Sequence, residues 1–264
     1  MPSTLFLRWR WIGAWTLANM LLAWLIASRY VDYIEPSGLT QWAYLGLVFL
    51  GHVSLLVWLG ALPLFVLAPI VRGRLMWLVG TIWASSLQLL LLLDTLVYDQ
   101  YRFHLSGFIL DLLLNAGGDV FSFSWVAISI TLAGILAMLV LQGVLGRMLK
   151  KRGTRGASRI AFALTVLALL GVHGWHAWAD AFYDQKITAM TRHFPLFYPA
   201  TAKRFFIEQG WVDAQEVRDH VKLGASSQAG RGLNYPLAPL ECRGSESPDN
   251  VMLVVVDALR HDML

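Results

Sequence analysis

The chain has 264 residues, of which 57% are apolar and only 14% are charged, and its net charge is +4. A soluble domain carries about 25% charged residues, so this composition argues against a water-soluble globular protein. Together with long uninterrupted apolar runs it indicates an integral membrane protein. A single cysteine, Cys242, excludes an intrachain disulfide and any paired-cysteine metal motif. We expect no nucleic-acid partner.

Five segments are long and apolar enough to cross about 30 Å of hydrocarbon. They run roughly over 11–27, 42–71, 75–97, 125–145 and 160–178. The second contains Gly60, Pro63 and Pro69, so it is expected to tilt or kink. Arginines precede the first span, but no small-residue cleavage site follows it, so we expect it to be retained. The sequence therefore predicts an all-α membrane protein, with 1–178 as a five-helix transmembrane domain.

Basic residues are distributed unevenly between the two ends of these spans. One side holds ten of them: Arg8, Arg10, Arg72, Arg74, Arg147, Lys150, Lys151, Arg152, Arg155 and Arg159. The loops on the other side hold only Arg29 and Arg102. Cytoplasmic loops carry the excess of Lys and Arg, so we expect a cytoplasmic N-terminus and everything after Trp178 on the far side, which in a Gram-negative cell is the periplasm. An amphipathic helix is expected over 108–114, in the outer loop.

Few ionisable residues lie within the spans. Asp94 lies near the outer end of the third span and is expected to make a structural polar contact, with Arg102 or another outer-face cation, rather than to act in transport. His52 is interpreted as an interhelical contact. His173 and His176 are one turn apart and could share a metal ion, but no third ligand is near in sequence, so we expect no metal site in this chain.

The segment 179–249 is predicted to be an interfacial linker with a short helix. Thr201 is a good N-cap, and Gly210 would end a helix over 202–209. Its first turn holds Lys203 and Arg204, beside aromatic residues. Free backbone N–H groups and two cations together favour phosphate, and neighbouring apolar surface favours a lipid. The predicted lipid-binding residues are Thr201, Ala202, Lys203, Arg204, Phe197, Tyr198 and Phe205. Alternatively, the two cations are solvated residues of a docking helix.

The segment 250–264 is predicted to begin with the first strand of a truncated hydrolase-like domain. An apolar run over 251–256 ends at Asp257, and many α/β hydrolases place a metal ligand at such a strand end. Asp257 is thus a candidate ligand only in a longer chain. We therefore expect no catalytic residue, metal or cofactor here.

Three stretches resemble the YejM (PbgA, LapC) family of Gram-negative inner-membrane proteins. They are Tyr101-Arg-Phe-His104, the run Pro195-Leu-Phe-Tyr-Pro199-Ala-Thr-Ala-Lys-Arg-Phe205, and residues 250–264, which are similar to the opening of alkaline phosphatases and sulfatases. The resemblance implies a non-enzymatic lipopolysaccharide sensor, in which the linker holds lipid A phosphate. It also implies that the membrane domain engages LapB and so restrains FtsH-mediated proteolysis of LpxC. Lys203 stands where the family resemblance leads us to expect an arginine.

Two other functions fit the same residues. One is a membrane-anchored phosphoryl or sulfuryl transferase or hydrolase, whose catalytic domain would follow Leu264. The other is a binding or transport protein for cardiolipin, a second phosphate-rich lipid. The sequence reveals neither the oligomeric state nor the surface that meets a cytoplasmic partner.

Overall fold

The computed structural model describes residues 4–107, 111, 124–152 and 156–213, all within one compact unit, Met1–Ala214. These residues form helices and no strand. Five helical spans are long and apolar enough to cross a membrane: Leu5–Tyr33, Leu39–Leu67, Gly73–Tyr101, Trp125–Lys150 and Ala157–Ala181. The predicted all-α membrane fold is therefore confirmed. The expected helix over 108–114, apart from Asp111, and the segment 250–264 with Asp257 lie outside the described residues, and the domain boundaries at 178 and 249 remain predictions.

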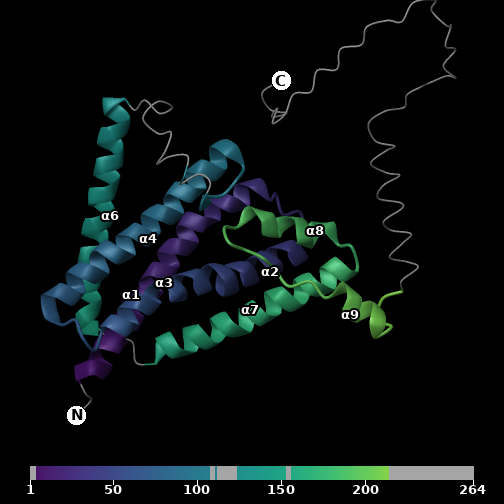
Figure 1. Ribbon diagram of the computed structural model, residues 1–264, viewed down its shortest axis with the longest axis horizontal. Helices are drawn as coiled ribbons and strands as arrows, with labels where there is room; N and C mark the ends of the chain where they lie inside the picture. The colour runs from purple at the N-terminus through teal and green to yellow at the C-terminus, as the bar shows by residue number, and fades with distance from the viewer. Residues whose placement is uncertain (1–3, 108–110, 112–123, 153–155, 214–264) are drawn as a thin grey trace, which may run out of the picture. The chain divides into compact units, whose positions relative to one another are not determined.

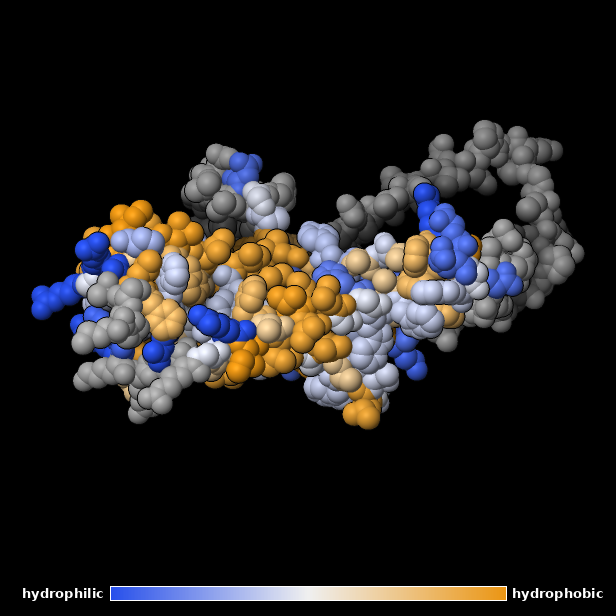
Figure 2. All heavy atoms as spheres, turned by 90° about the horizontal axis from the view of Figure 1, so that it is seen from below, coloured by the Kyte–Doolittle hydropathy of each residue, from blue (hydrophilic) through white to orange (hydrophobic). Residues whose placement is uncertain are grey.

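The spans are built from helices that follow one another in the chain (Figure 1). They comprise α1 (Thr4–Ala27) with the 3₁₀ turn η1 (Ser28–Tyr33), α2 (Leu39–Val48), the π turn η2 (Phe49–Val53), α3 (Ser54–Leu67), α4 (Gly73–Tyr101), α6 (Trp125–Arg152) and α7 (Ala157–Ala181). Helix α1 contacts α3, α4, α6 and α7, so it is central to the packing. Figure 2 shows apolar residues over the middle of one face, with hydrophilic residues toward both ends.

The second span is interrupted by the π turn η2, which lies before Gly60 and Pro63. Ser54 compensates for the altered ladder, because its hydroxyl donates to the Phe49 carbonyl (2.9 Å) and accepts from Trp24 Nε1 (3.0 Å). Pro63 lies inside α3, whereas Pro69 follows the end of that helix. The tilt or kink of this span remains a prediction, and the irregularity that the structure shows is a π turn that no proline marks.

Close packing of η2 on α7 requires a glycine at position 51. A Cβ atom on Gly51 would lie 2.8 Å from the backbone nitrogen of Leu169 and 2.9 Å from the carbonyl carbon of Ala168. Any larger residue would force the two helices apart. The π turn therefore sits directly against α7, and its side chains are presented beside that helix.

A polar cluster joins α1, α4 and α6 at mid-span. Trp15 Nε1 donates to Gln142 Oε1 (2.8 Å), and Gln142 Nε2 donates to Asn19 Oδ1 (2.6 Å). Gln88 Nε2 donates to the same Asn19 oxygen (3.1 Å). Buried side-chain amides that bond across helices hold transmembrane bundles together. The N-terminal half of α6, residues 125–137, is by contrast exposed all round within the described part of the chain.

Candidate functional site

The segment after α7 packs against one end of the spanning helices. It contains the short helix α8 (Gln185–Thr188), the 3₁₀ turn η3 (Ala189–His193), an extended stretch, and the helix α9 (Lys203–Glu208). The Asp184 side chain accepts from the backbone N–H of Lys186 (3.0 Å) and so caps α8. Four buried apolar residues of this segment belong to the same core as Tyr30, Tyr44 and Tyr98; they are Ile187, Met190, Phe194 and Phe197. The linker is therefore part of the packed structure.

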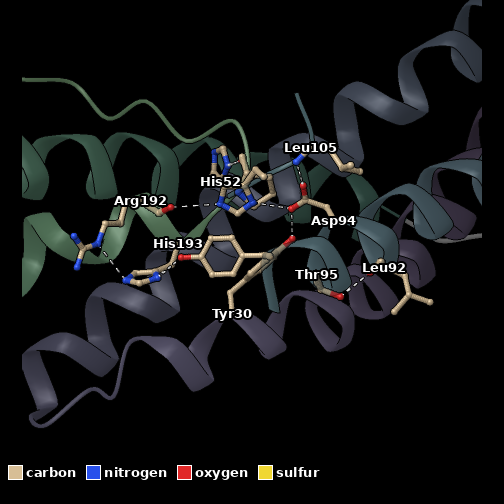
Figure 3. Close-up of polar contacts among 11 residues, drawn as sticks. Tyr30, His52, Leu92, Asp94, Thr95, Leu105, Arg192 and His193 are labelled. Atoms are coloured by element: carbon tan, nitrogen blue, oxygen red, sulfur yellow. Dashed lines mark hydrogen bonds and ion pairs between the residues drawn. The ribbon is translucent and has the colours of Figure 1, made fainter. Parts of the chain in front are cut away.

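Asp94 is the centre of a hydrogen-bonded cluster near the C-terminal end of α4 (Figure 3). Its carboxylate accepts from the Tyr30 hydroxyl (2.5 Å) and the Leu105 backbone N–H (2.6 Å), and His104 Nδ1 lies 2.7 Å from Oδ2. The expected structural polar contact is confirmed. Its partner is His104 rather than Arg102, because Arg102 ends α4 in a left-handed conformation and lies over the Tyr33 ring, 4.0 Å from its centroid.

The same cluster extends to the linker through His104 and Tyr98. The His104 ring stacks on Tyr98 with centroids 4.6 Å apart, and its Nε2 lies 3.4 Å from the Arg192 carbonyl oxygen. The Tyr98 hydroxyl is 2.6 Å from His193 Nδ1. Burial, together with the nearby charges of Arg192, His104 and Arg102, lowers the pKa of His193 to about 4. Near neutral pH, His193 is therefore an uncharged partner of Tyr98.

Three histidines of the spanning helices hold the extended part of the linker by its backbone. His52 Nε2, in η2, lies 2.9 Å from the Pro195 carbonyl oxygen. His173 Nδ1, in α7, accepts from the Ala200 N–H (3.0 Å), and His176 Nδ1 lies 3.1 Å from the Ala200 carbonyl oxygen. The sequence predicts that His52 makes a polar contact with a neighbouring helix. The polar contact is present, but its partner is the linker. We call these three residues and the stretch 195–200 the histidine clamp.

The clamp gives His173 and His176 a shared backbone partner. The Nδ1 atoms of the two rings contact the backbone of one residue, Ala200: His173 accepts from its N–H, and His176 lies 3.1 Å from its carbonyl oxygen. Within the described residues, no group of three or more His, Cys, Asp or Glu side chains is placed to hold a metal ion. The arrangement positions a backbone segment, and we assign the two histidines that role.

The predicted lipid-binding residues are divided between the core and the surface. Phe197 is buried, and its ring stacks on His52 with centroids 4.3 Å apart. Tyr198 is 86% exposed, and Phe205 is also exposed. Thr201 is exposed but does not cap α9, because the N-cap is Ala202 and no side chain bonds there. The predicted N-cap, Thr201, is therefore wrong by one residue, and the helix starts only at Lys203. The reason is that the clamp holds Ala200, the residue before Thr201.

The two basic residues of α9 lie in different environments. Lys203 is half-buried, and its Nζ is 3.4 Å from the centroid of the Tyr183 ring, in a cation–π contact. Arg204 is exposed and has no hydrogen bond or ion pair with any residue that the structure describes. Phe206 attaches α9 to α7. Its ring meets the Trp178 ring edge-on with centroids 5.6 Å apart, and it also contacts the Trp211 ring in a tilted arrangement. Arg204, Phe205 and Trp211 are exposed, and the rings of Phe205 and Trp211 contact each other with centroids 6.0 Å apart.

Comparison with known proteins places the chain in a family. The family model described as "Domain of unknown function (DUF3413)" matches residues 5–242. The chain belongs to this family. Relatives of the DUF3413 chain include the "Inner membrane protein YejM" of Salmonella typhimurium and that of Salmonella typhi, each 31% identical over 259 residues and 94% of the chain. An uncharacterized protein of Haemophilus influenzae is 30% identical over 267 residues, or 96% of the chain.

The chain spans 43% to 44% of the length of these relatives. The resemblance to the YejM family that its motifs suggest is confirmed by these matches, and the chain is a multi-pass inner-membrane protein. The histidine clamp and the contacts of Asp94 are not evident from any local motif of this DUF3413 chain. A signal that could have pointed to some of them is the presence of Asp94, His104, His173 and His176 near the same ends of apolar spans.

Proposed function

We propose that this chain senses lipopolysaccharide at the outer leaflet of the inner membrane without catalysing a reaction. The observation that carries the proposal is the pairing of Lys203 and exposed Arg204 with exposed aromatic rings on one docked helix. Cations suit the phosphates of a lipid headgroup, and a guanidinium binds phosphate in a fork geometry. Aromatic rings such as Phe205 and Trp211 suit the boundary between headgroups and acyl chains.

The fixed position of the segment supports this role. The histidine clamp holds Ala200, and Phe206 holds α9 against Trp178. A binding group that is already ordered loses less conformational entropy when its ligand binds. Lys203 is preorganised further by its contact with Tyr183. These contacts support a headgroup site whose backbone is in place before the lipid arrives.

The distribution of charge supports an outer-leaflet location. Arg8 hydrogen-bonds to the Ala68 carbonyl, and Arg147 lies over the Trp77 ring, 4.2 Å from its centroid. Both belong to the basic end of the spans, whereas the linker packs at the opposite end, near Asp94. We take the basic end as cytoplasmic by the positive-inside rule, so the linker is periplasmic. From the family resemblance, we further propose that the membrane domain contacts LapB and thereby regulates LpxC stability through FtsH.

The headgroup site can be tested by lipid co-purification. We expect Lys203→Ala with Arg204→Ala to lower the lipopolysaccharide carried through purification at least several-fold, because each cation near an anionic lipid is worth about 1 kcal/mol. The matched control is Arg29→Ala with Lys186→Ala, which removes two other exposed outer-end cations. Mass spectrometry of the bound lipids gives the readout. Unchanged lipopolysaccharide in a folded double variant would overturn the proposal.

The same measurement separates lipopolysaccharide from cardiolipin. If cardiolipin is the main bound lipid and falls in the Lys203 and Arg204 variant, while lipopolysaccharide is absent, the site is a cardiolipin site and the sensor proposal is wrong. Adding either lipid back in excess to delipidated protein identifies which one restores the wild-type melting temperature.

A further inference from the structure

Every histidine among the described residues lies where the linker meets an earlier part of the chain. Each makes a contact of hydrogen-bond length across that boundary; they are His52, His104, His173, His176 and His193. Histidine is the side chain whose ordinary charge change falls between about pH 5 and pH 8. The attachment of the linker therefore depends on a residue type that takes up protons near neutral pH.

Two rings of the histidine clamp face hydrogen-bond acceptors. His52 Nε2 lies 2.9 Å from the Pro195 carbonyl oxygen, and His176 Nδ1 lies 3.1 Å from the Ala200 carbonyl oxygen. A carbonyl oxygen can only accept, so each of these ring nitrogens carries a proton and donates. Both contacts are possible for a neutral ring and for a charged one, so neither contact by itself opposes protonation.

His173 is the exception, because its partner is a donor. The Nδ1 atom accepts from the Ala200 N–H at 3.0 Å, so this nitrogen holds no proton while the linker is docked. A charged imidazole has two N–H donors and no acceptor. Turning the ring does not restore the bond, since both of its nitrogens then carry protons. Proton uptake by His173 and its contact with Ala200 therefore exclude each other.

The surroundings of His173 offer no compensating charge. His176 is one turn away on α7, and both it and His52 are close enough for their charges to interact with that of His173. Asp180 is about two turns away on the same helix, and no described residue forms an ion pair with His173. The other titratable groups on helices that contact α7 are Arg8, Arg10, Tyr44, Lys186, Lys203, Arg204 and Glu208.

The contact is also placed where its loss would move the basic helix. Ala200 is exposed and His173 is half-buried, so their hydrogen bond lies at the surface of the described protein. Helix α9 begins at Lys203, three residues after Ala200. Releasing Ala200 removes the attachment immediately before Lys203 and Arg204, and leaves α9 held by the packing of Phe206 on Trp178.

We propose that a proton on His173 releases the stretch 195–200 from α7, so that the linker is docked near neutral pH and detached in acid. An imidazole in water takes up a proton below about pH 6.5. The released state binds this proton and the docked state does not, so acid favours release. Control of the headgroup site by this release rests on the proposed function, whereas the release itself does not.

The test is hydrogen exchange of the full chain in phosphatidylcholine nanodiscs without lipopolysaccharide. Protection factors are compared at about pH 7.5 and about pH 5.5, which removes the direct effect of pH on exchange chemistry. At the lower pH His193 is still neutral, because its pKa is about 4. The Ala200 amide is expected to lose about tenfold in protection, as for one hydrogen bond, while the amides of α8 keep theirs. Equal protection of Ala200 at both pH values would overturn the proposal, as would an equal loss in α8.

Two glutamine variants identify the ring that takes the proton. His173→Gln supplies a carboxamide oxygen that accepts from the Ala200 N–H and does not titrate, so protection is expected to be the same at both pH values. His176→Gln is the matched control, since its NH₂ group can donate to the Ala200 carbonyl and His173 remains; it is expected to keep the wild-type pH dependence. The same loss in both variants would overturn the role of His173. The wild-type profile alone decides whether the linker detaches, should a variant fail to fold.

Lipopolysaccharide binding tests the consequence for the headgroup site. The wild type is expected to retain several-fold less lipopolysaccharide at about pH 5.5 than at about pH 7.5, and His173→Gln the same amount at both. Linker release in the exchange measurement without this loss of lipid would overturn control of the site and leave the release intact. Full binding by the Lys203 and Arg204 double variant would overturn the headgroup site and leave the exchange result untouched, so the two failures are distinguishable.

Discussion

His104 Nδ1 lies 2.7 Å from Asp94 Oδ2, and this contact ties the outer loop to the end of the third span. The pair is also connected to the linker, because His104 stacks on Tyr98 and Tyr98 contacts His193. A carboxylate at this depth is costly unless it is paired and hydrogen-bonded. Asp94 meets that requirement with three contacts from two segments, namely Tyr30 of η1 and the adjacent residues His104 and Leu105, so it holds together the surface on which the linker rests.

Asp94→Asn is expected to destabilise the protein by about 2–4 kcal/mol. The asparagine amide keeps the shape of the side chain, but its NH₂ group would face a donor, either the Leu105 N–H or His104. The measurement is thermal unfolding followed by tryptophan fluorescence. The control is Asp99→Asn, since exposed Asp99 accepts a hydrogen bond from the Tyr33 hydroxyl. Equal effects of the two substitutions would show that Asp94 is no more important than a surface carboxylate.

The stability of the protein is expected to decrease as pH falls from about 6.5 to about 4. His193 has a pKa of about 4 in the folded protein and about 6.5 when unfolded. The unfolded chain therefore binds the extra proton first, so the stability is full above about pH 6.5 and lost as pH falls toward 4. We expect a loss on the order of 1–2 kcal/mol from this residue.

His193→Asn isolates this contribution from that of the other histidines. Asparagine can still bond to the Tyr98 hydroxyl but does not titrate. Between pH 7 and pH 4, the melting temperature of the wild type is expected to fall more than that of the variant, because only the wild type has His193 to protonate. Parallel curves would assign the pH dependence to other groups.

The spans and the family could be predicted from the sequence, whereas the contacts of the linker could not. A run such as 160–178 is apolar over its whole length, and this property alone determines that it crosses a bilayer. The π turn at Phe49–Val53 has no such signal, because it depends on how Gly51 packs against α7. Long-range packing of this kind cannot be obtained from local patterns.

The candidate site shows the same division at the level of single residues. Lys203 and Arg204 could be selected from the sequence, because two adjacent cations beside aromatic residues form a local pattern. Phe197 belongs to the same pattern, but its ring is buried on His52, about 145 residues away in the chain. Thr201 has good cap chemistry, yet Ala200 is held by α7 and the helix begins later. Tertiary contacts overrode local preference at both positions.

Gly51→Ala is expected to destabilise the protein by about 1–3 kcal/mol. The added Cβ would meet the backbone of Ala168 and Leu169 at 2.9 Å and 2.8 Å, and backbone atoms cannot move aside alone. Gly46→Ala is the control, because nothing lies within 4 Å of the Cβ position in α2. That change is expected to be neutral or to stabilise by about 0.5–1 kcal/mol. Thermal unfolding of both variants distinguishes steric conflict from a general effect of alanine.

His173→Ala with His176→Ala is expected to loosen the linker without unfolding the spans. Each substitution removes one hydrogen bond to Ala200, and each bond is worth about 0.5–1.5 kcal/mol. Hydrogen exchange at the Ala200 amide gives a direct readout, since this N–H donates to His173 Nδ1 in the wild type. A loss of about 1.4 kcal/mol corresponds to about tenfold faster exchange.

The amides of α8 serve as the internal control for that measurement, because their bonds are made within the helix and to Asp184. If they exchange faster by the same factor, the whole segment has detached, and the two histidines hold more than Ala200. If only the stretch 195–202 is affected, the clamp acts locally. The local result also predicts weaker lipopolysaccharide binding in this variant, because Lys203 and Arg204 would lose the fixed position that favours binding.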